Sequence, residues 1–170
     1  MSTPVVFPVG LYLGPMHPGP GRRADHVRVM IGDAVVGLVD GESTLWGRAH
    51  EAALTRAELV ATDTVDIGRL LGIGAMVEVD PDAPVAFARS YRLRPLQSAL
   101  GEVAPGRFGI GTAGVAHAVV DDWAHDLWLR CAAAPDLLTA CGTAPVLDQF
   151  VQKGHTLLAG AAAYLGPVAR

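Results

Sequence analysis

Apolar residues alternate with other residues along the first forty positions of the chain. The alternation runs through residues 4–13 and predicts a strand there. Residues 26–40 contain two apolar runs on either side of Gly32 and Asp33, a pair that suits a tight turn, and they therefore predict a hairpin. The stretch between these strands, residues 15–23, is rich in proline and glycine and is predicted to be a loop.

After Asp40 the apolar spacing changes to three or four residues, which indicates a helix. Asp40 or Ser43 is expected to accept hydrogen bonds from the free N–H groups at the start of this helix. The apolar residues on its inward face are Leu45, Trp46, Ala49 and Ala53.

Two more short helices and a strand are predicted before residue 81. Thr55 and Glu58 have the spacing of a capping box, so a helix is expected to follow Thr55. Asp66 opens the next helix, and the glycines at 72 and 74 end it. Residues 75–80 return to a strand pattern, which gives the order strand, hairpin, three helices, strand.

The second half of the chain follows the same order. Residues 107–120 form two β-compatible arms around a glycine-rich turn, and Asp122 begins a helix. Two further helices are predicted, one with Pro135 in its first turn and one over residues 146–154. Identical residues stand at the same spacing in the two halves: Asp40, Leu45, Trp46 and Arg48 in the first, and Asp122, Leu127, Trp128 and Arg130 in the second. We therefore expect an internal duplication.

A G-x-G-x-x-G motif at Gly109, Gly111 and Gly114 raises the question of dinucleotide binding. Such a site needs a buried strand before the first glycine and a helix that starts at the last. Here the residues after Gly114 favour a strand, and no acidic residue follows at the expected distance. The glycines are instead expected to form the turn of a hairpin, as Gly32 and Asp33 do in the first half.

A hairpin before three short helices is typical of winged-helix units. In this class the segments VDGESTLW, TRAELV and VDIGRLLGIGAMVEV resemble the PqqD-like family, the peptide-recognition domains of ribosomal peptide-modification systems. The resemblance covers about residues 5–80 and, less clearly, 107–160. It implies an α+β fold of two winged-helix-like units, each a small antiparallel sheet with three short helices, packed as a pseudo-repeat. The expected divisions are a first unit at 1–83, a connecting segment at 84–106 and a second unit at 107–170.

In the family that this chain resembles, a leader peptide adds to the sheet edge as an extra strand beside the third helix. This implies a non-catalytic module for a peptide or protein partner, such as a precursor peptide delivered to a modifying enzyme. The family usually has one unit, so one of the two copies here can serve as packing only. The peptide-binding residues carried over by the resemblance are Val35, Val36, Gly37, Leu38, Val39, Asp66, Arg69 and Leu70.

Arginines in the segment between the halves provide a second candidate surface. Arg89, Arg92 and Arg94 are opposed only by Glu102 and are candidates to contact phosphate or an acidic partner. The alternative function is a DNA-binding winged-helix regulator, in which these arginines would lie on a wing that contacts phosphate. However, the third helix offers only Arg69 as a polar residue for base recognition, so nucleic acid is not favoured. The competing interpretation of the arginines is a solvated surface with packed aliphatic stems.

Composition narrows the function further. The 170 residues carry a net charge of −4, which argues against a broad basic face for nucleic acid. Their 51% hydrophobic content supports a packed core. With no run of about 18 apolar residues, no secretory leader and two cysteines, we expect a cytoplasmic protein without membrane contact. The arginine-, alanine- and glycine-rich composition suggests a bacterial source.

Chemistry-bearing clusters are scarce in the sequence. The four serines lie outside any nucleophile elbow, and the Asp121–His125 pair lacks a third ligand at metal spacing. We therefore expect no enzymatic activity, no cofactor and no metal. The sequence leaves open the partner, the half that binds it, the oligomeric state and whether the chain completes another protein's active site.

Overall fold

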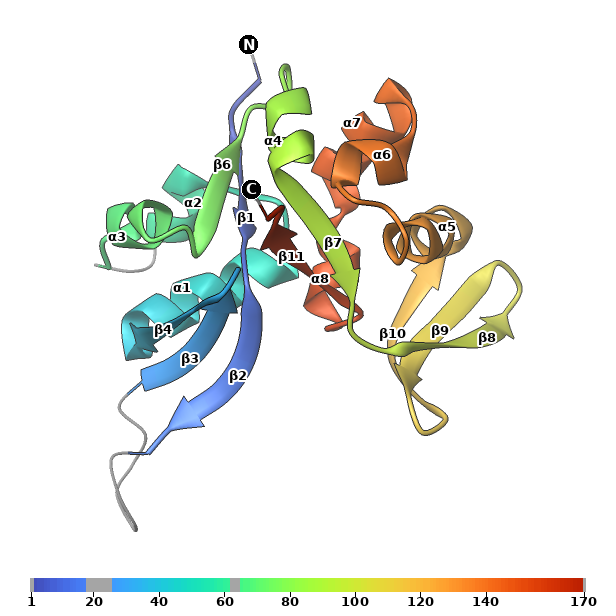
Figure 1. The fold of residues 1–170 in the computed structure, drawn as a ribbon, viewed down its shortest axis with the longest axis horizontal. Helices are drawn as coiled ribbons and strands as arrows, with labels where there is room; N and C mark the ends of the chain where they lie inside the picture. Colours follow the sequence, from blue (N-terminus) through green and yellow to red (C-terminus); the bar gives the residue numbers. More distant parts are fainter. Residues whose placement is uncertain (1, 18–25, 62–64, 170) are drawn as a thin grey trace.

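The computed structural model describes residues 2–17, 26–61 and 65–169 (Figure 1). Short helices alternate with several small antiparallel sheets, so the predicted α+β class is confirmed. Most of the loop predicted over 15–23 lies outside the described residues.

A three-stranded antiparallel meander, with its strands in the order β2-β3-β4, leads directly into α1. Gly32 and Asp33 join β3 to β4, as predicted. Gly32 has a φ of +59°, which suits the first position of a two-residue hairpin turn. The elements that open the chain are β1 (Val5–Pro8), β2 (Leu11–Met16), β3 (His26–Ile31), β4 (Ala34–Val39) and α1 (Asp40–Glu51).

The single strand predicted over residues 4–13 is wrong, because the chain changes sheet at Gly10. Gly10 has a φ of +108°, which L residues rarely adopt, and a Cβ there would lie 2.5 Å from Cγ1 of Val29. The bend takes β1 into a sheet of order β5-β1-β6 and β2 into the meander. The same residue donates its N–H to the Leu165 carbonyl at 2.8 Å, which ties the bend to the end of the chain.

Helix α1 begins differently from the prediction. Its N-cap is Val39, so Asp40 is already helical, and the Ser43 hydroxyl donates to the Asp40 carbonyl at 2.8 Å instead of capping the helix. Asp40 and Ser43 were therefore wrong as caps, since β4 runs into the helix without an intervening loop. Glu42 takes part in the capping instead, because its carboxylate accepts the Val39 N–H at 3.1 Å.

The rest of the first half follows the prediction closely. Thr55 and Glu58 form the expected capping box: the Thr55 hydroxyl accepts the Glu58 N–H at 3.3 Å, and the Glu58 carboxylate accepts the Thr55 N–H at 2.7 Å. Asp66 caps the next helix through the Gly68 N–H at 2.8 Å. These elements are β5 (Leu54–Thr55), α2 (Arg56–Val60), α3 (Ile67–Gly72) and β6 (Met76–Val79).

Residues 84–106 contain regular elements that pair with the second half of the chain. They are α4 (Val85–Ser90), β7 (Tyr91–Pro95) and β8 (Ser98–Ala104). β7 pairs with β11, and β8 forms the outer strand of a second meander of order β10-β9-β8.

The second meander also leads directly into a helix. The turn between β9 and β10 consists of Ala113 and Gly114, with φ values of 51° and 81°. The helix predicted to begin at Asp122 does so, with Asp121 as its N-cap. Asp136 caps the following helix, so Pro135 lies before that helix and not in its first turn. The elements are β9 (Arg107–Thr112), β10 (Val115–Asp121), α5 (Asp122–Cys131), α6 (Leu137–Cys141), α7 (Ala144–Lys153), α8 (His155–Ala159) and β11 (Ala163–Pro167).

Two hydrophobic cores meet at β1. Val6 belongs to the core beneath the first meander, whereas Phe7 points to the other side and belongs to the core of the second half. Phe7 stacks there on Phe150 at 5.5 Å and on His155 at 4.1 Å between ring centroids. In Figure 1 the two meanders lie on opposite sides of the molecule, with β1, β7 and β11 between them.

Candidate functional site

Strand β4, which carries five of the predicted peptide-binding residues, is an edge of its sheet within the described residues. It pairs with β3 on one side, and Val35 and Val39 are each 56% exposed. Leu38 is fully buried, and Val36 is half-buried on the same inward face. One face of the strand thus packs on the core, and the other face exposes valine side chains to solvent.

The register of β4 indicates which backbone groups are open. The Val39 N–H donates to Glu42 at 3.1 Å, so Val39 belongs to a pair that does not exchange ladder hydrogen bonds with His26. Such pairs alternate with bonded ones in an antiparallel ladder. By this alternation, the N–H and C=O groups of Val35 and Gly37 also point away from β3. The open part of the edge is therefore centred on residues 35–37.

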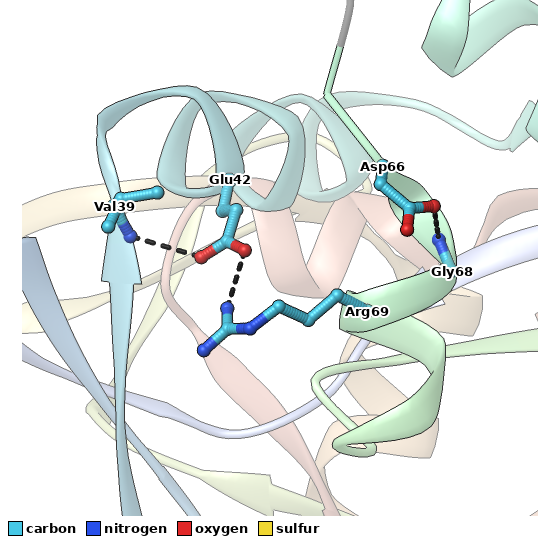
Figure 2. Close-up of polar contacts among 5 residues, drawn as sticks. All are labelled: Val39, Glu42, Asp66, Gly68 and Arg69. Atoms are coloured by element: carbon cyan, nitrogen blue, oxygen red, sulfur yellow. Dashed lines mark hydrogen bonds and ion pairs between the residues drawn. The ribbon is translucent and has the colours of Figure 1, made fainter.

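Glu42 joins the edge to the third helix (Figure 2). One carboxylate oxygen accepts the Val39 N–H and the other accepts from Nη1 of Arg69 on α3. The Glu42 side chain is 9% exposed and the Arg69 side chain 49%, so the carboxylate of this ion pair is buried and the arginine side chain is half exposed at the surface. Arg69 is therefore held beside the edge and already has a carboxylate partner.

The other predicted residues of the third helix have structural roles. Asp66 is exposed and caps α3, as Figure 2 shows. Leu70 is fully buried in the first core, so its side chain is not available to a partner in this conformation. The structure thus brings Val39 and Arg69 together through Glu42, a residue that the sequence analysis did not select.

The three predicted arginines separate into two locations. Arg92 and Arg94 lie on the same face of β7 and line one cleft of about 460 Å³, which also includes Leu11, Leu96 and Tyr164. The Arg92 Nε atom is shielded from solvent and has no hydrogen-bond partner among the described residues. Arg89, at the end of α4, instead lines a different cleft with Ser90 and Tyr91.

The G-x-G-x-x-G motif lies in the hairpin of β9 and β10. Gly114 is followed by a strand rather than a helix, so it opens no helix N-terminus. Gly109 and Gly111 lie inside β9, so only Gly114 of the three occupies the predicted turn. A Cβ at Gly111 would fall 1.9 Å from the Val115 carbonyl oxygen, so close packing of the backbone explains the glycine at this position.

Burial governs the titratable groups of the interior. Burial, partly opposed by the hydrogen bond to the Val6 carbonyl, lowers the pKa of His155 to about 4. Burial likewise lowers the pKa of His50. For the thiols burial acts in the other direction and raises the pKa of Cys131 to about 12 and that of Cys141 to about 11. Both thiols are therefore protonated at neutral pH and poor nucleophiles.

The remaining candidate chemistry is accounted for by local structure. Asp121 accepts the Ala124 N–H at 2.9 Å as the cap of α5, and His125 stacks on Phe108 with ring centroids 4.3 Å apart. In the part of the chain that the structure describes, no three His, Cys, Asp or Glu side chains are grouped to hold a metal ion. Over the same residues, every helix is too short or too polar to cross a bilayer.

Comparison with known proteins gives no matching family model, no matching curated protein and no matching solved structure.

Proposed function

We propose that this chain is a non-catalytic recognition module that binds an extended peptide segment along β4. The observation that carries the proposal is the open edge at Val35 and Gly37. It combines backbone donors and acceptors that face away from β3 with valine side chains that are more than half exposed. An added strand would satisfy these groups, and its side chains would meet the valines.

We further propose that the two halves are winged-helix-like copies. Several contacts recur at matching places. The Val9 N–H donates to the Ala75 carbonyl at 2.8 Å where β1 pairs with β6, and the Leu96 N–H donates to the Ala162 carbonyl at 3.0 Å where β7 pairs with β11. Arg48 on α1 donates to the Leu59 carbonyl, and Arg130 on α5 to the Cys141 carbonyl. On this basis β7 and β8 would belong to the second copy.

The first copy is the better candidate to bind a peptide. On β10, the corresponding edge of the second meander, the Val119 carbonyl already accepts a hydrogen bond from the Arg107 side chain at 3.1 Å. Gly160, just after α8, also packs against this strand, because a Cβ there would lie 2.4 Å from the Cβ of Ala118. The second copy would then act mainly as packing.

The partner suggested by the resemblance to PqqD-like domains is a precursor peptide that a modifying enzyme acts on, in the cytoplasm of a bacterium. Acidic segments of such a partner could also contact Arg92 and Arg94. DNA binding is the alternative function, but Arg69 is already engaged by Glu42, which leaves α3 poorly supplied with groups to recognise bases.

A selection of random peptides on the immobilised full chain tests the proposal. Val35→Pro removes an N–H that faces away from β3, so the ladder to β3 stays intact while the edge is blocked. We expect selected peptides to bind Val35→Pro at least about tenfold more weakly than the unaltered chain, since each lost backbone hydrogen bond weakens binding by about 1 kcal/mol and the ring obstructs pairing.

Val35→Thr is the matched control, because it keeps the N–H and a β-branched side chain and should bind the peptides normally. Both variants should keep the thermal midpoint of the unaltered chain within a few degrees. Peptides that bind all three proteins equally would refute recognition at this edge. Retention of mixed-sequence duplex DNA at moderate salt, unaffected by Val35→Pro, would favour a DNA-binding regulator instead.

A further inference from the structure

A concave surface lies away from β4, where the two halves of the chain meet. A mostly apolar cleft of about 320 Å³ opens between α1, the start of β2 and the segment from α8 to β11. Its walls include Tyr12, Trp46, His50, Leu96 and Tyr164. A cavity of about 150 Å³ holds benzene, so this cleft has room for a larger ring system with a substituent.

Hydrogen bonds fix the aromatic walls in advance. The Trp46 indole N–H donates to the Val9 carbonyl at 3.1 Å. The His50 Nδ1 donates to the Trp46 carbonyl at 2.8 Å, and the two rings meet edge to face at 4.2 Å. Because these side chains are already ordered, a ligand would lose little free energy by immobilising them.

Gly47 leaves the cleft open at a cost to the helix. It lies in the interior of α1, where glycine destabilises a helix by about 1 kcal/mol relative to alanine. Apart from its chain neighbours and the nearby backbone of its own helix, no described atom lies within 4 Å of the place that a Cβ would take, so packing in the described residues does not require a glycine here. Since Gly47 also lines the cleft, its missing side chain enlarges the space available to a ligand.

The arginine cleft adjoins this apolar cleft. Leu11, Leu96 and Tyr164 belong to the walls of both, and Arg92 and Arg94 lie in the neighbouring part. No acidic side chain of the described residues lines the arginine cleft, although Asp33 lines a separate cleft that Arg94 and Tyr164 also border. Two guanidinium groups in a cleft without a described carboxylate, next to an aromatic-lined cleft, present complementary surfaces for an anion with an apolar body.

We propose that the two adjoining clefts bind one amphipathic carboxylate: an aromatic ring system in the apolar cleft, joined by a short aliphatic chain to a carboxylate on Arg92 and Arg94. This site does not depend on the peptide edge, because Val35 and Gly37 line neither cleft. The same chemistry is present in a small aromatic acid and in the last residue of a peptide that ends in tryptophan.

Calorimetric titration of the full chain with indole-3-propionate tests the proposal, with 3-ethylindole as a neutral analogue. We expect saturable binding of the acid, about tenfold tighter than that of the neutral analogue, because a charge-assisted hydrogen bond adds about 1.5 kcal/mol. Arg92→Gln and Arg94→Gln should each reduce this preference while leaving the affinity for 3-ethylindole unchanged. Gly47→Leu should abolish binding of both compounds, since its side chain would occupy the apolar cleft.

Gly72→Leu is the matched control, because Gly72 is exposed near the end of α3, has no neighbour within 4 Å of a Cβ and lines neither cleft. It should bind both compounds like the unaltered chain. Binding of the tetrapeptide Gly-Gly-Gly-Trp as well as indole-3-propionate would identify a peptide C-terminus as a source of the ligand; binding of the acid alone would identify a free small molecule. Equal affinity for the acid and 3-ethylindole, or no saturable binding of either, would overturn the proposal.

Discussion

The two meanders reach the same local architecture by different capping chemistry. In the first, β4 runs into α1 at Val39, whose N–H is taken by Glu42, and Glu42 in turn pairs with Arg69. In the second, β10 runs into α5 at Asp121, whose own carboxylate accepts the Ala124 N–H. The N-cap of the first helix thus depends on a carboxylate that is held by α3, whereas the second helix is capped by the side chain of its own N-cap residue, whose other oxygen lies 4.0 Å from Lys153 of α7.

This difference bears on which edge is open. Val39 lies at the outer edge of β4, so Glu42 closes the edge there and leaves residues 35–37 as its open part. On β10 the closure comes from Arg107 at the Val119 carbonyl and from the packing of Gly160. Strand order alone gives two equivalent edges, and it is the side chains around each helix start and strand that distinguish them.

The largest expected loss of stability concerns the two tryptophans that occupy matching positions in the two halves. Trp46 and Trp128 are 7% and 6% exposed, and each indole N–H donates to a backbone carbonyl, of Val9 at 3.1 Å and of Ala162 at 2.9 Å. We expect Trp46→Ala and Trp128→Ala each to lower the free energy of unfolding by about 3–5 kcal/mol, because each leaves a cavity and an unpaired carbonyl. Urea unfolding followed by circular dichroism measures the losses.

Trp123→Ala is the control for that pair, because Trp123 is only partly buried and its N–H bonds to no described residue. We expect it to lose clearly less stability than either of the other two variants. Because β1 contributes Val6 to one core and Phe7 to the other, this strand links the two cores. All variants should therefore unfold in one transition. A loss at Trp128 much smaller than that at Trp46 would show that the two regions do not use their tryptophans equivalently.

Much of the local structure was predictable from the sequence, because it depends on neighbouring residues. The Gly32-Asp33 turn, the Thr55–Glu58 capping box and the Asp66 cap are set by residues within three positions of one another. The change of sheet at Gly10 was not predictable, because the alternation of apolar residues continues across it. Only the positive φ of Gly10 and its close approach to Val29 reveal the change.

The candidate sites were less predictable for the same reason. Strand β4 was expected as an edge, but the role of Glu42 depends on Arg69, which is 27 positions away. A valine N-cap followed by glutamate at the third helical position was the one local signal of that role. The apolar cleft joins residues from both halves of the chain, and an unexplained glycine inside a predicted helix, Gly47, was its only trace in the sequence.

The second test concerns the contact that joins the two regions. His155 on α8 is 3% exposed, and its Nε2 donates to the Val6 carbonyl of β1 at 3.2 Å. Its pKa in the folded chain is about 4, below the ordinary 6.5, so between these values the unfolded chain binds more protons than the folded one. Stability should therefore be fully present above pH 6.5 and fall by about 3 kcal/mol as the pH drops toward 4.

Urea unfolding at several pH values measures this slope, and His155→Phe removes the titrating group while keeping an aromatic ring against Phe7. We expect the variant to lose most of the pH dependence in that window. The part that remains should come from His50, whose pKa burial also lowers, and from carboxyl groups near the lower end. An unchanged slope in His155→Phe would show that this histidine does not carry the acid sensitivity of the junction.

The smallest effects separate the two helix starts themselves. Glu42→Ala and Asp121→Ala should each lower the free energy of unfolding by about 1 kcal/mol, since each leaves a backbone N–H at a helix start without its acceptor. The amide of Val39 should exchange faster in the first variant and that of Ala124 in the second, as hydrogen exchange by NMR can measure. The Glu42 loss should shrink more in high salt than the Asp121 loss, because the Glu42–Arg69 pair is in direct hydrogen-bond contact, whereas Asp121 Oδ2 lies 4.0 Å from Lys153 Nζ and both of those side chains are about half exposed. Arg69→Met should reproduce the salt-sensitive part of the Glu42 loss while leaving the exchange of Val39 nearly unchanged. If salt instead affected both helix starts equally, the first would be no more dependent on α3 than the second is on its own neighbours, and the distinction between the two edges would rest on β10 alone.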